Sequence, residues 1–293
     1  MFRNWEKFAD IASVTASGTG TADLPVAGCY YALWFRCLDG GAAVSVANIK
    51  QNITNLKLAL DGVTVMEADA HLLFDLYEQQ FAWGGAAQRA GMLPVILAPD
   101  WLTRHLEADA LAWGMKGIKS FQVEFTFSSL VGTAGHIDQI QCFAERIALD
   151  RPLGTHRRLL RYARSFASSG VQELTELPTE GGAGVVTTGY HFQYDGAAAV
   201  INNVEMLVNN QVVLNIPPLV AQHRLEKAAR LWQVSAAAKD LFSLPFDVTN
   251  DLLGYVPHSG LNDLRFRLDW SAAPNAYSVY RESYHNMKAE NYR

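Results

Sequence analysis

Alternating apolar and polar residues recur in two stretches of the chain that resemble each other. The first begins at Ile53 and reads ITNLKLALDGVTVMEADAHLLFDLYEQ; the second begins at Ile201 and reads INNVEMLVNNQVVLNIPPLVAQHRLEK, and the two align without a gap. In each, an alternating segment reaches a two-residue turn signal, Asp61-Gly62 or Asn209-Asn210, and a second short apolar segment follows. Period-two alternation is typical of a strand with one buried face, and such turns join antiparallel strands. The pattern predicts a β-hairpin in each half.

A helix is predicted directly after each hairpin. Between Glu67 and Phe81 the apolar residues recur at helical spacing and share one face. They are Ala70, Leu73, Phe74, Tyr77 and Phe81. The second copy begins at the start signal Pro217-Pro218, and its weaker stripe comprises Val220, His223, Leu225 and Ala228. Both segments are interpreted as a helix that covers the edge of a sandwich.

The similarity between the halves extends beyond the hairpins in both directions. Upstream, LDGGAAV at Leu38 resembles YDGAAAV at Tyr194, and FADIASVTASGTGTADLP at Phe8 resembles YARSFASSGVQELTELP at Tyr162. Downstream, IKSFQVEFTFSS at Ile118 matches LNDLRFRLDWSA at Leu261, and each half ends in one more strand, near 137–143 and 276–280. Several short strands separated by Gly, Pro, Asn and Asp indicate a β-sandwich or jelly roll.

The pattern therefore predicts an all-β fold of two tandem antiparallel sandwiches or jelly rolls, with about seven or eight strands each and short inserted helices. The Pro/Gly segment 150–154 suggests the boundary, with an N-terminal jelly roll over 1–150 and a C-terminal jelly roll over 151–293. A length of 293 residues fits two domains, and 49% hydrophobic residues supply ample core.

Composition narrows the functional classes. The net charge of -5 and the pI of about 5.9 leave no electrostatic footprint for nucleic acid, so direct nucleic-acid binding is not expected. Three cysteines, Cys29, Cys37 and Cys142, cannot form a complete disulfide framework and are interpreted as buried thiols of a protein made in a reducing cytoplasm. We find no transmembrane stretch and no signal peptide, so the chain is expected to be soluble when made.

Candidate catalytic and ligand motifs are weak. Gly18-Thr19-Gly20 lacks the third glycine of a phosphate loop and is interpreted as a turn before a strand, and Ser168-Ser169-Gly170 lies in a predicted turn rather than a nucleophile elbow. Asp69, Asp75 and Glu78 are assigned to the solvated side of the first predicted helix. We therefore predict no catalytic residue, no cofactor and no enzymatic activity.

Metal binding stays open at this point. The histidines show no ligand motif: His71, His105, His136, His156, His191, His223, His258 and His285. A structural calcium ion between subunits fits turn carboxylates and carbonyls in general, but no loop matches a dedicated calcium motif, so no metal ligand is named.

A cluster of charged residues and a cluster of aromatic residues each suggest a surface that contacts a partner or a membrane. Five arginines fall within 14 residues without an acid among them: Arg151, Arg157, Arg158, Arg161 and Arg164. We interpret this cluster as an interface, either across the two sandwiches or with a neighbouring subunit, with lipid headgroups as the alternative ligand.

At the N-terminus, Phe2, Trp5 and Phe8 recur at helical spacing, which predicts a short interfacial helix against a bilayer. The alternative is a strand extension packed under the first jelly roll.

Six segments together suggest a known family: RNWEKFADI, DLPVAGCYYALWFRC, LPVILAPDWL, ALAWG, RPLGTHRRLLRYARSFASSGVQEL and RFRLDWSAAPN. They resemble the major capsid protein family of the corticoviruses and related proteobacterial prophages. The resemblance covers nearly the whole chain and implies a double jelly roll, that is, two tandem antiparallel eight-stranded sandwiches. It further implies a bacteriophage major capsid protein, a homotrimer with a hexagonal outline that tiles an icosahedral shell over an internal membrane. It also implies neighbouring capsomers, penton proteins and minor membrane proteins as partners in the virion. One difference is the helical segment 99–115, which the second half replaces with the loop 247–260.

Two other classes remain as alternatives. Jelly rolls also serve as lectins, so a tandem sandwich could be a receptor-binding or glycan-binding spike. A cupin-type enzyme would need clustered histidine ligands in one barrel mouth, and the histidine spacing argues against it.

Overall fold

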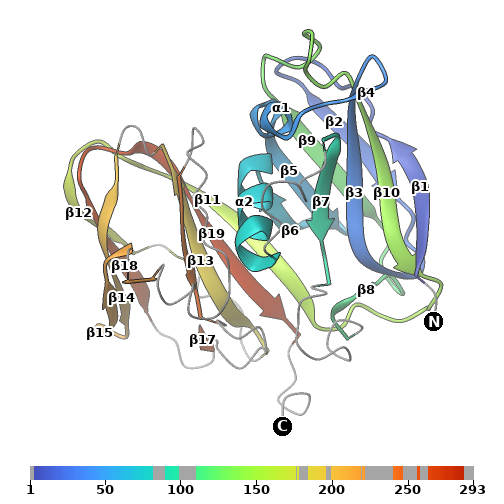
Figure 1. Ribbon diagram of the computed structural model, residues 1–293. Coiled ribbons are helices and arrows are strands. Elements are labelled where there is room, and N and C mark those ends of the chain that lie inside the picture. The colour runs from blue at the N-terminus through green and yellow to red at the C-terminus, as the bar shows by residue number, and fades with distance from the viewer. Residues whose placement is uncertain are drawn as a thin grey trace. The chain divides into compact units, whose positions relative to one another are not determined.

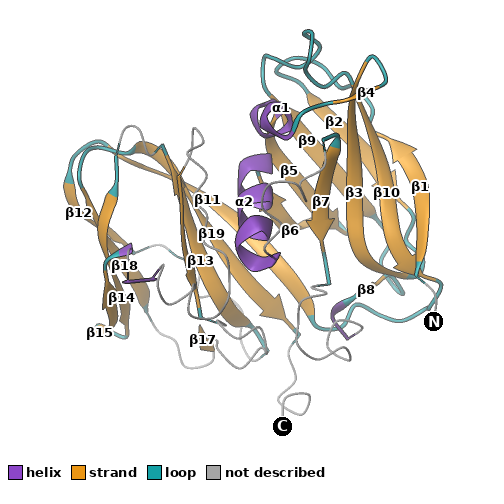
Figure 2. Cartoon of the chain, viewed as in Figure 1, coloured by secondary structure: helices purple, strands orange, loops and turns teal. Residues whose placement is uncertain are grey.

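The computed structural model forms two compact units, Met1–Leu160 and Arg161–Arg293. The structure describes residues 3–81, 90–98, 110–175, 177, 184–195, 199–218, 220–221, 240–246, 256–257 and 263–286. Strands dominate both units, and helices are short (Figures 1 and 2). This confirms the all-β prediction; the domain boundary after Asp150 stays a prediction.

In the first unit, one sheet has the order β1-β10-β3-β7. Its strands are β1 (Asn4–Asp10), β10 (Gln139–Ile147), β3 (Cys29–Asp39) and β7 (Met92–Ile96), and two short strands, β4 (Ala42–Ala43) and β8 (Trp113–Gly114), also pair with β3. All these pairs are antiparallel.

The other sheet of the first unit has the order β2-β9-β5-β6, and its pairs are antiparallel too. Its strands are β2 (Thr19–Leu24), β9 (Phe121–Phe127), β5 (Ile53–Leu60) and β6 (Val63–Ala68). Two helices accompany the sheets, α1 (Val46–Asn52) and α2 (Ala70–Phe81). Helix α1 was not predicted from the sequence; it begins at Ser45, whose hydroxyl accepts a hydrogen bond from the Asn48 N–H at 3.2 Å.

The second unit repeats the same strand orders. One sheet has the order β11-β19-β13-β16 and the other β12-β18-β14-β15. The first contains β11 (His156–Phe166), β19 (Asn275–His285), β13 (Val186–Tyr194) and β16 (Asp240–Pro245), with the short β17 (Val256–Pro257) beside β13. The second contains β12 (Gly170–Leu174), β18 (Leu264–Trp270), β14 (Ile201–Val208) and β15 (Gln211–Ile216). In both units the sheets interleave strands from the two ends of the segment, which is jelly-roll connectivity.

Both predicted hairpins are confirmed, β5–β6 and β14–β15. The turn residues adopt left-handed conformations, with φ of 50° and 78° at Asp61-Gly62 and 48° and 66° at Asn209-Asn210, which suits two-residue hairpins. Each hairpin also contains a bulge at the same place. The extra residue is Val65 in β6 and Val213 in β15, 148 positions apart like Ile53 and Ile201. The two hairpins therefore occupy equivalent positions down to their irregularities.

Each sandwich encloses an apolar core. In the first unit, the Phe35 and Phe125 rings from opposite sheets meet edge-on at 4.9 Å, and the alternating residues Leu56 and Leu58 are fully buried. In the second, Phe266 lies between Tyr190 and Phe192, with ring centroids 4.8 and 5.5 Å away. Edge-to-face aromatic pairs of this kind join the two sheets of a sandwich.

The helix after the second hairpin falls largely outside the described residues, including His223, Leu225 and Ala228. Most of the segment 99–115 and of the loop 247–260 also lies outside them. The first helix begins at Ala70 rather than Glu67, because Glu67 and Ala68 complete strand β6. No helix of the described chain is long and apolar enough to span a membrane.

Candidate functional site

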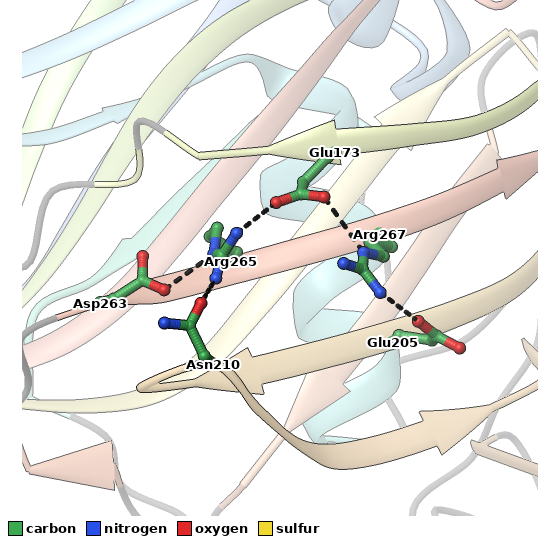
Figure 3. Close-up of polar contacts among 6 residues, drawn as sticks. All are labelled: Glu173, Glu205, Asn210, Asp263, Arg265 and Arg267. Atoms are coloured by element: carbon green, nitrogen blue, oxygen red, sulfur yellow. Dashed lines mark hydrogen bonds and ion pairs between the residues drawn. The ribbon is translucent and has the colours of Figure 1, made fainter.

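The outer face of the sheet β12-β18-β14-β15 carries a ladder of charged side chains (Figure 3). Arg265 and Arg267 of β18 both donate to Glu173 of β12, at 2.6 Å from Arg265 Nη1 and 3.1 Å from Arg267 Nε. On the other side, Arg267 Nη1 lies 3.6 Å from an Oε2 of Glu205 on β14. Arg265 also donates to Asp263 at 2.7 Å and to Asn210 in the hairpin turn. The ladder thus ties three neighbouring strands together.

The electrostatic effect of the ladder is local. Hydrogen bonds from Arg265 and Arg267 lower the pKa of the Glu173 carboxyl, and the hydrogen bond to Glu173 raises the pKa of Arg265. These side chains stay partly exposed, so the ion pairs contribute little to stability. Their main effects are to fix strand register and to give this face its charge pattern.

The matching face of the first unit carries one equivalent ion pair, with the charges reversed. Lys57 of β5 lies 3.6 Å from Glu124 of β9, and the two residues are direct cross-strand partners. Glu205 and Arg267 are cross-strand partners at the equivalent positions of β14 and β18. A neighbouring amide contact is also repeated, since Asn55 donates to Glu67 at 2.9 Å in the first unit. In the second unit Asn203 donates to Asn215 at 2.8 Å. The two faces therefore share a pattern but differ in the order of their charges.

The five arginines of the sequence cluster do not form one surface. Arg157 is fully buried, and its guanidinium donates to the Ile96 carbonyl at 3.3 Å, so for this residue contact with a neighbouring subunit or a headgroup is wrong. Arg151 donates to the Ala112 carbonyl at 2.9 Å, and Arg161 to the Ser278 hydroxyl at 3.0 Å. For Arg158, Arg161 and Arg164, which are partly accessible on β11, contact with a neighbouring subunit or a headgroup stays a prediction.

His156, at the start of β11, is held as a neutral imidazole. Its Nδ1 donates to the Gly154 carbonyl at 2.9 Å, and its Nε2 accepts from Arg158 Nε at 3.2 Å. The ring lies edge-on to Trp113 at 6.2 Å, and the residue is 2% exposed. Burial lowers the pKa of His156 to about 4, and the nearby Arg158 charge acts in the same direction.

This histidine predicts acid sensitivity. The unfolded chain takes up a proton at His156 below about pH 6.5, whereas the folded chain does so only below about pH 4. The free energy of unfolding is therefore expected to fall between these values, by about 3 kcal/mol from this group alone. Urea unfolding of the His156→Gln variant and of the unmodified protein between pH 4 and 8 measures this pH dependence of the free energy of unfolding. Parallel stability curves for the two proteins would contradict the assignment.

The carboxylates Asp69 and Asp75 do not lie on a solvated face, which corrects the prediction from the sequence. Asp69 is 1% exposed and caps α2, because its Oδ1 accepts a hydrogen bond from the Leu72 N–H at 2.7 Å. Asp75 receives the Lys50 ammonium of α1 at 2.5 Å in a mostly buried pair. The Glu78 side chain lies outside the described residues. Helix periodicity could not reveal these roles, since both depend on where the helix begins and on α1.

Removal of the cap has a defined cost. We expect Asp69→Ala to lower the free energy of unfolding by about 1–2 kcal/mol, since it leaves a helix N–H without its side-chain acceptor. Asp69→Asn keeps an acceptor oxygen and serves as the control, with an expected loss of under about 0.5 kcal/mol. Denaturant unfolding monitored by circular dichroism compares them; equal losses in the two variants would count against a capping role.

The N-terminal segment is a strand, so the prediction of an interfacial helix is wrong. Of the alternative, a strand extension packed under the first jelly roll, the strand and the packing of Phe8 are confirmed, whereas Trp5 is largely exposed. Strand β1 pairs with β10, which supplies backbone partners along its length. The Phe8 ring packs 6.1 Å from Tyr30 and under the Arg146 guanidinium at 4.5 Å. Trp5 lies on the other face, 5.3 Å from Trp34, and is 60% exposed. Phe2 lies outside the described residues, and lipid contact at this segment stays a prediction.

The other sequence motifs have structural roles. Thr19 and Gly20 begin β2 after a turn, and Gly170 begins β12 after a bend, as predicted. The three cysteines are free and buried, which confirms the prediction of buried thiols. Burial raises the pKa of all three thiols, to about 12 at Cys142, so they stay protonated near neutral pH.

The sequence analysis missed a row of three interacting polar side chains, because these residues are far apart in the sequence. His191 Nδ1 lies 3.0 Å from the Ser243 hydroxyl, and His191 Nε2 lies 3.3 Å from a Glu282 oxygen. His191 is 1% exposed, Ser243 is 2% exposed and Glu282 is 6% exposed. A substrate cannot reach a buried hydroxyl, so this arrangement cross-links β13, β16 and β19 rather than presenting a nucleophile. In the described part of the chain, no group of His, Cys, Asp and Glu is arranged to hold a metal.

Comparison with known proteins agrees with this geometry. Residues 156–287 match the family model described as viral coat protein P2 C-terminal domain. The major capsid protein P2 from bacteriophage PM2 has the same fold, with a TM-score of 0.78 and 15% identity over 98% of this chain and 99% of that chain. The STIV MCP matches with a TM-score of 0.69 and 9% identity, over 97% of both chains. The PBCV-1 virus capsid protein matches with a TM-score of 0.63 and 10% identity, over 97% of this chain and 94% of that chain. No curated protein matches the chain by sequence.

The tandem sandwiches and these matches define a viral capsid protein of the double jelly-roll class, a component of the virion. The second jelly roll is similar to the viral coat protein P2 C-terminal domain family, and the resemblance to corticovirus major capsid proteins is confirmed.

Proposed function

We propose that this capsid protein assembles into homotrimers with a pseudo-hexagonal outline and that these capsomers tile an icosahedral shell over an internal membrane. The observation that carries the proposal is the equivalence of the two jelly rolls, which extends to strand order and to the bulges at Val65 and Val213. Three chains with two equivalent sandwiches each supply six similar blocks, so one gene product can fill hexagonal positions in a lattice.

The role is structural, and the proposal includes no catalytic step. The partners are further copies of this chain, penton and minor membrane proteins, and the lipid of the internal membrane, whereas direct nucleic-acid contact is not proposed because of the net charge of -5. Calcium between subunits also stays a prediction; mass measurement of the assembly with and without a chelator tests it.

Sedimentation equilibrium together with electron microscopy tests the main proposal. We expect three times the monomer mass of 32.3 kDa and six-sided particles that pack edge to edge. A receptor-binding or glycan-binding spike, the alternative function, would give isolated oligomers that do not tile. A protein that remains monomeric at assembly concentrations would contradict the trimer.

A further inference from the structure

One edge of the first jelly roll is covered by the chain itself. The first residues of β11 belong to the first unit, and Leu159 pairs in parallel with Met66 of β6. Both side chains are fully buried, and the neighbouring bulge residue Val65 is 2% exposed. The first residues of β11, within the first unit, therefore lie at the β6 edge.

Among the residues that the structure describes, no strand covers the equivalent edge of the second jelly roll. Leu214 of β15 stands where Met66 stands in β6, 148 positions earlier. Among the described strands, β15 is terminal in its sheet, with a neighbour on one side only. Val212 and Val213 are 52% and 53% exposed, although Val213 is the counterpart of the buried Val65. An exposed apolar edge strand favours pairing with another chain.

A second edge without a neighbouring strand, among the described residues, is that of β1 in the first jelly roll. Strand β1 opens the first jelly roll as β11 opens the second, and the sequence repeat aligns Phe8 with Tyr162, which places Trp5 at the position of Leu159. Leu159 is fully buried, whereas Trp5 is 60% exposed. Strand β1 is also terminal among the described strands of its sheet. Strands β1 and β15 thus each carry one half of a contact that β6 and the first residues of β11 complete.

We propose that β1 of one copy of this chain docks in parallel along β15 of a second copy, with Trp5 over Val212, Val213 and Leu214. This contact rests on the proposed homotrimer. If its six similar blocks alternate around a ring, the pairing of β6 with the first residues of β11 recurs between chains as a pairing of β15 with β1. The Met66–Leu159 pair is its template. A tryptophan inserted among aliphatic side chains is typical of the residues that dominate interface energies.

Disulfide trapping tests the contact directly. The variant Trp5→Cys with Leu214→Cys is expected to form closed covalent trimers on non-reducing gels, since Cα atoms paired across strands lie within disulfide reach. The native thiols are buried with raised pKa values, so they give little background. Trp5→Cys with Val171→Cys is the matched control, because Val171 is 64% exposed but lies on β12 at the opposite edge of the sheet. Trapping in the control to the same extent would overturn the proposal.

Charge insertion gives an independent measure. Trp5→Glu and Val213→Glu are each expected to raise the trimer dissociation constant at least about tenfold, whereas Val171→Glu changes it less than about threefold. Circular dichroism establishes that each subunit is folded. Trimers that tolerate Trp5→Glu, while binding of assembled particles to phospholipid vesicles is lost, would assign Trp5 to lipid and overturn the contact. An unmodified protein that never trimerises would instead refute the proposed function itself.

Discussion

Replacement of Phe266 by alanine is expected to unfold the second jelly roll at markedly lower denaturant concentration. Phe266 is fully buried in β18 and packs against the rings of Tyr190 and Phe192 from the opposite sheet. The substitution loses the burial of an aromatic ring and leaves a cavity between two sheets that cannot close fully. We expect a loss of about 3–5 kcal/mol in the free energy of unfolding.

Guanidinium unfolding, followed by tryptophan fluorescence, measures this loss. Val171→Ala is the control, because Val171 lies on a neighbouring strand of the same sheet and is 64% exposed; its expected change is within about 0.5 kcal/mol. A loss below about 1 kcal/mol for Phe266→Ala would mean that the two sheets do not pack through this ring.

The second large effect is expected at a glycine. Gly114 of β8 runs beside the segment that leads into the second jelly roll, so closely that a Cβ atom would overlap the Arg151 carbonyl and lie 2.6 Å from the Pro152 carbonyl. Both obstacles are backbone atoms, which cannot rotate away. Gly114→Ala is therefore expected to cost about 3 kcal/mol, at the upper end of overpacking effects.

A nearby glycine provides the comparison. A Cβ atom on Gly154 would meet nothing closer than the Ala110 carbonyl at 3.9 Å, so Gly154→Ala is expected to change stability by less than about 1 kcal/mol. Thermal unfolding of the two variants, with yield of folded protein as a second readout, distinguishes them. Similar midpoints would show that the segment around Arg151 can move aside.

The parts of the fold that the sequence predicts well are those determined by local periodicity and turn chemistry. The hairpins at Ile53 and Ile201 follow from alternation and from the residues that tolerate positive φ. Their equivalence follows from the gapless repeat, which preserves which side chains face the core. The pairing of β10 with both β1 and β3 could not be predicted this way, because it joins segments more than 100 residues apart.

The predictions that failed concern residues whose environment depends on distant segments. The apolar spacing of Trp5 and Phe8 fits a helix as well as a strand, and β10 decides for the strand by supplying hydrogen-bond partners. Arg157 carries a charge, as surface residues commonly do, but it is buried against Ile96, and no local sequence pattern indicates this burial. The Ser243–His191–Glu282 chain likewise exists only once three distant strands are adjacent.

The reversed charges on the two outer faces bear on how the chain reaches its fold. Two homologous sandwiches in one polypeptide risk exchanging strands during folding, since the apolar faces of β5 and β14 are nearly interchangeable. An exchange would place Lys57 opposite Arg267 and Glu205 opposite Glu124, whereas the native partners are Glu124 for Lys57 and Arg267 for Glu205. Like charges in direct cross-strand positions are destabilising, so the misassembled chain loses two attractive pairs and gains two repulsive ones. The charge order thus favours pairing of β5 and β14 within their own halves and disfavours strand exchange between the two sandwiches.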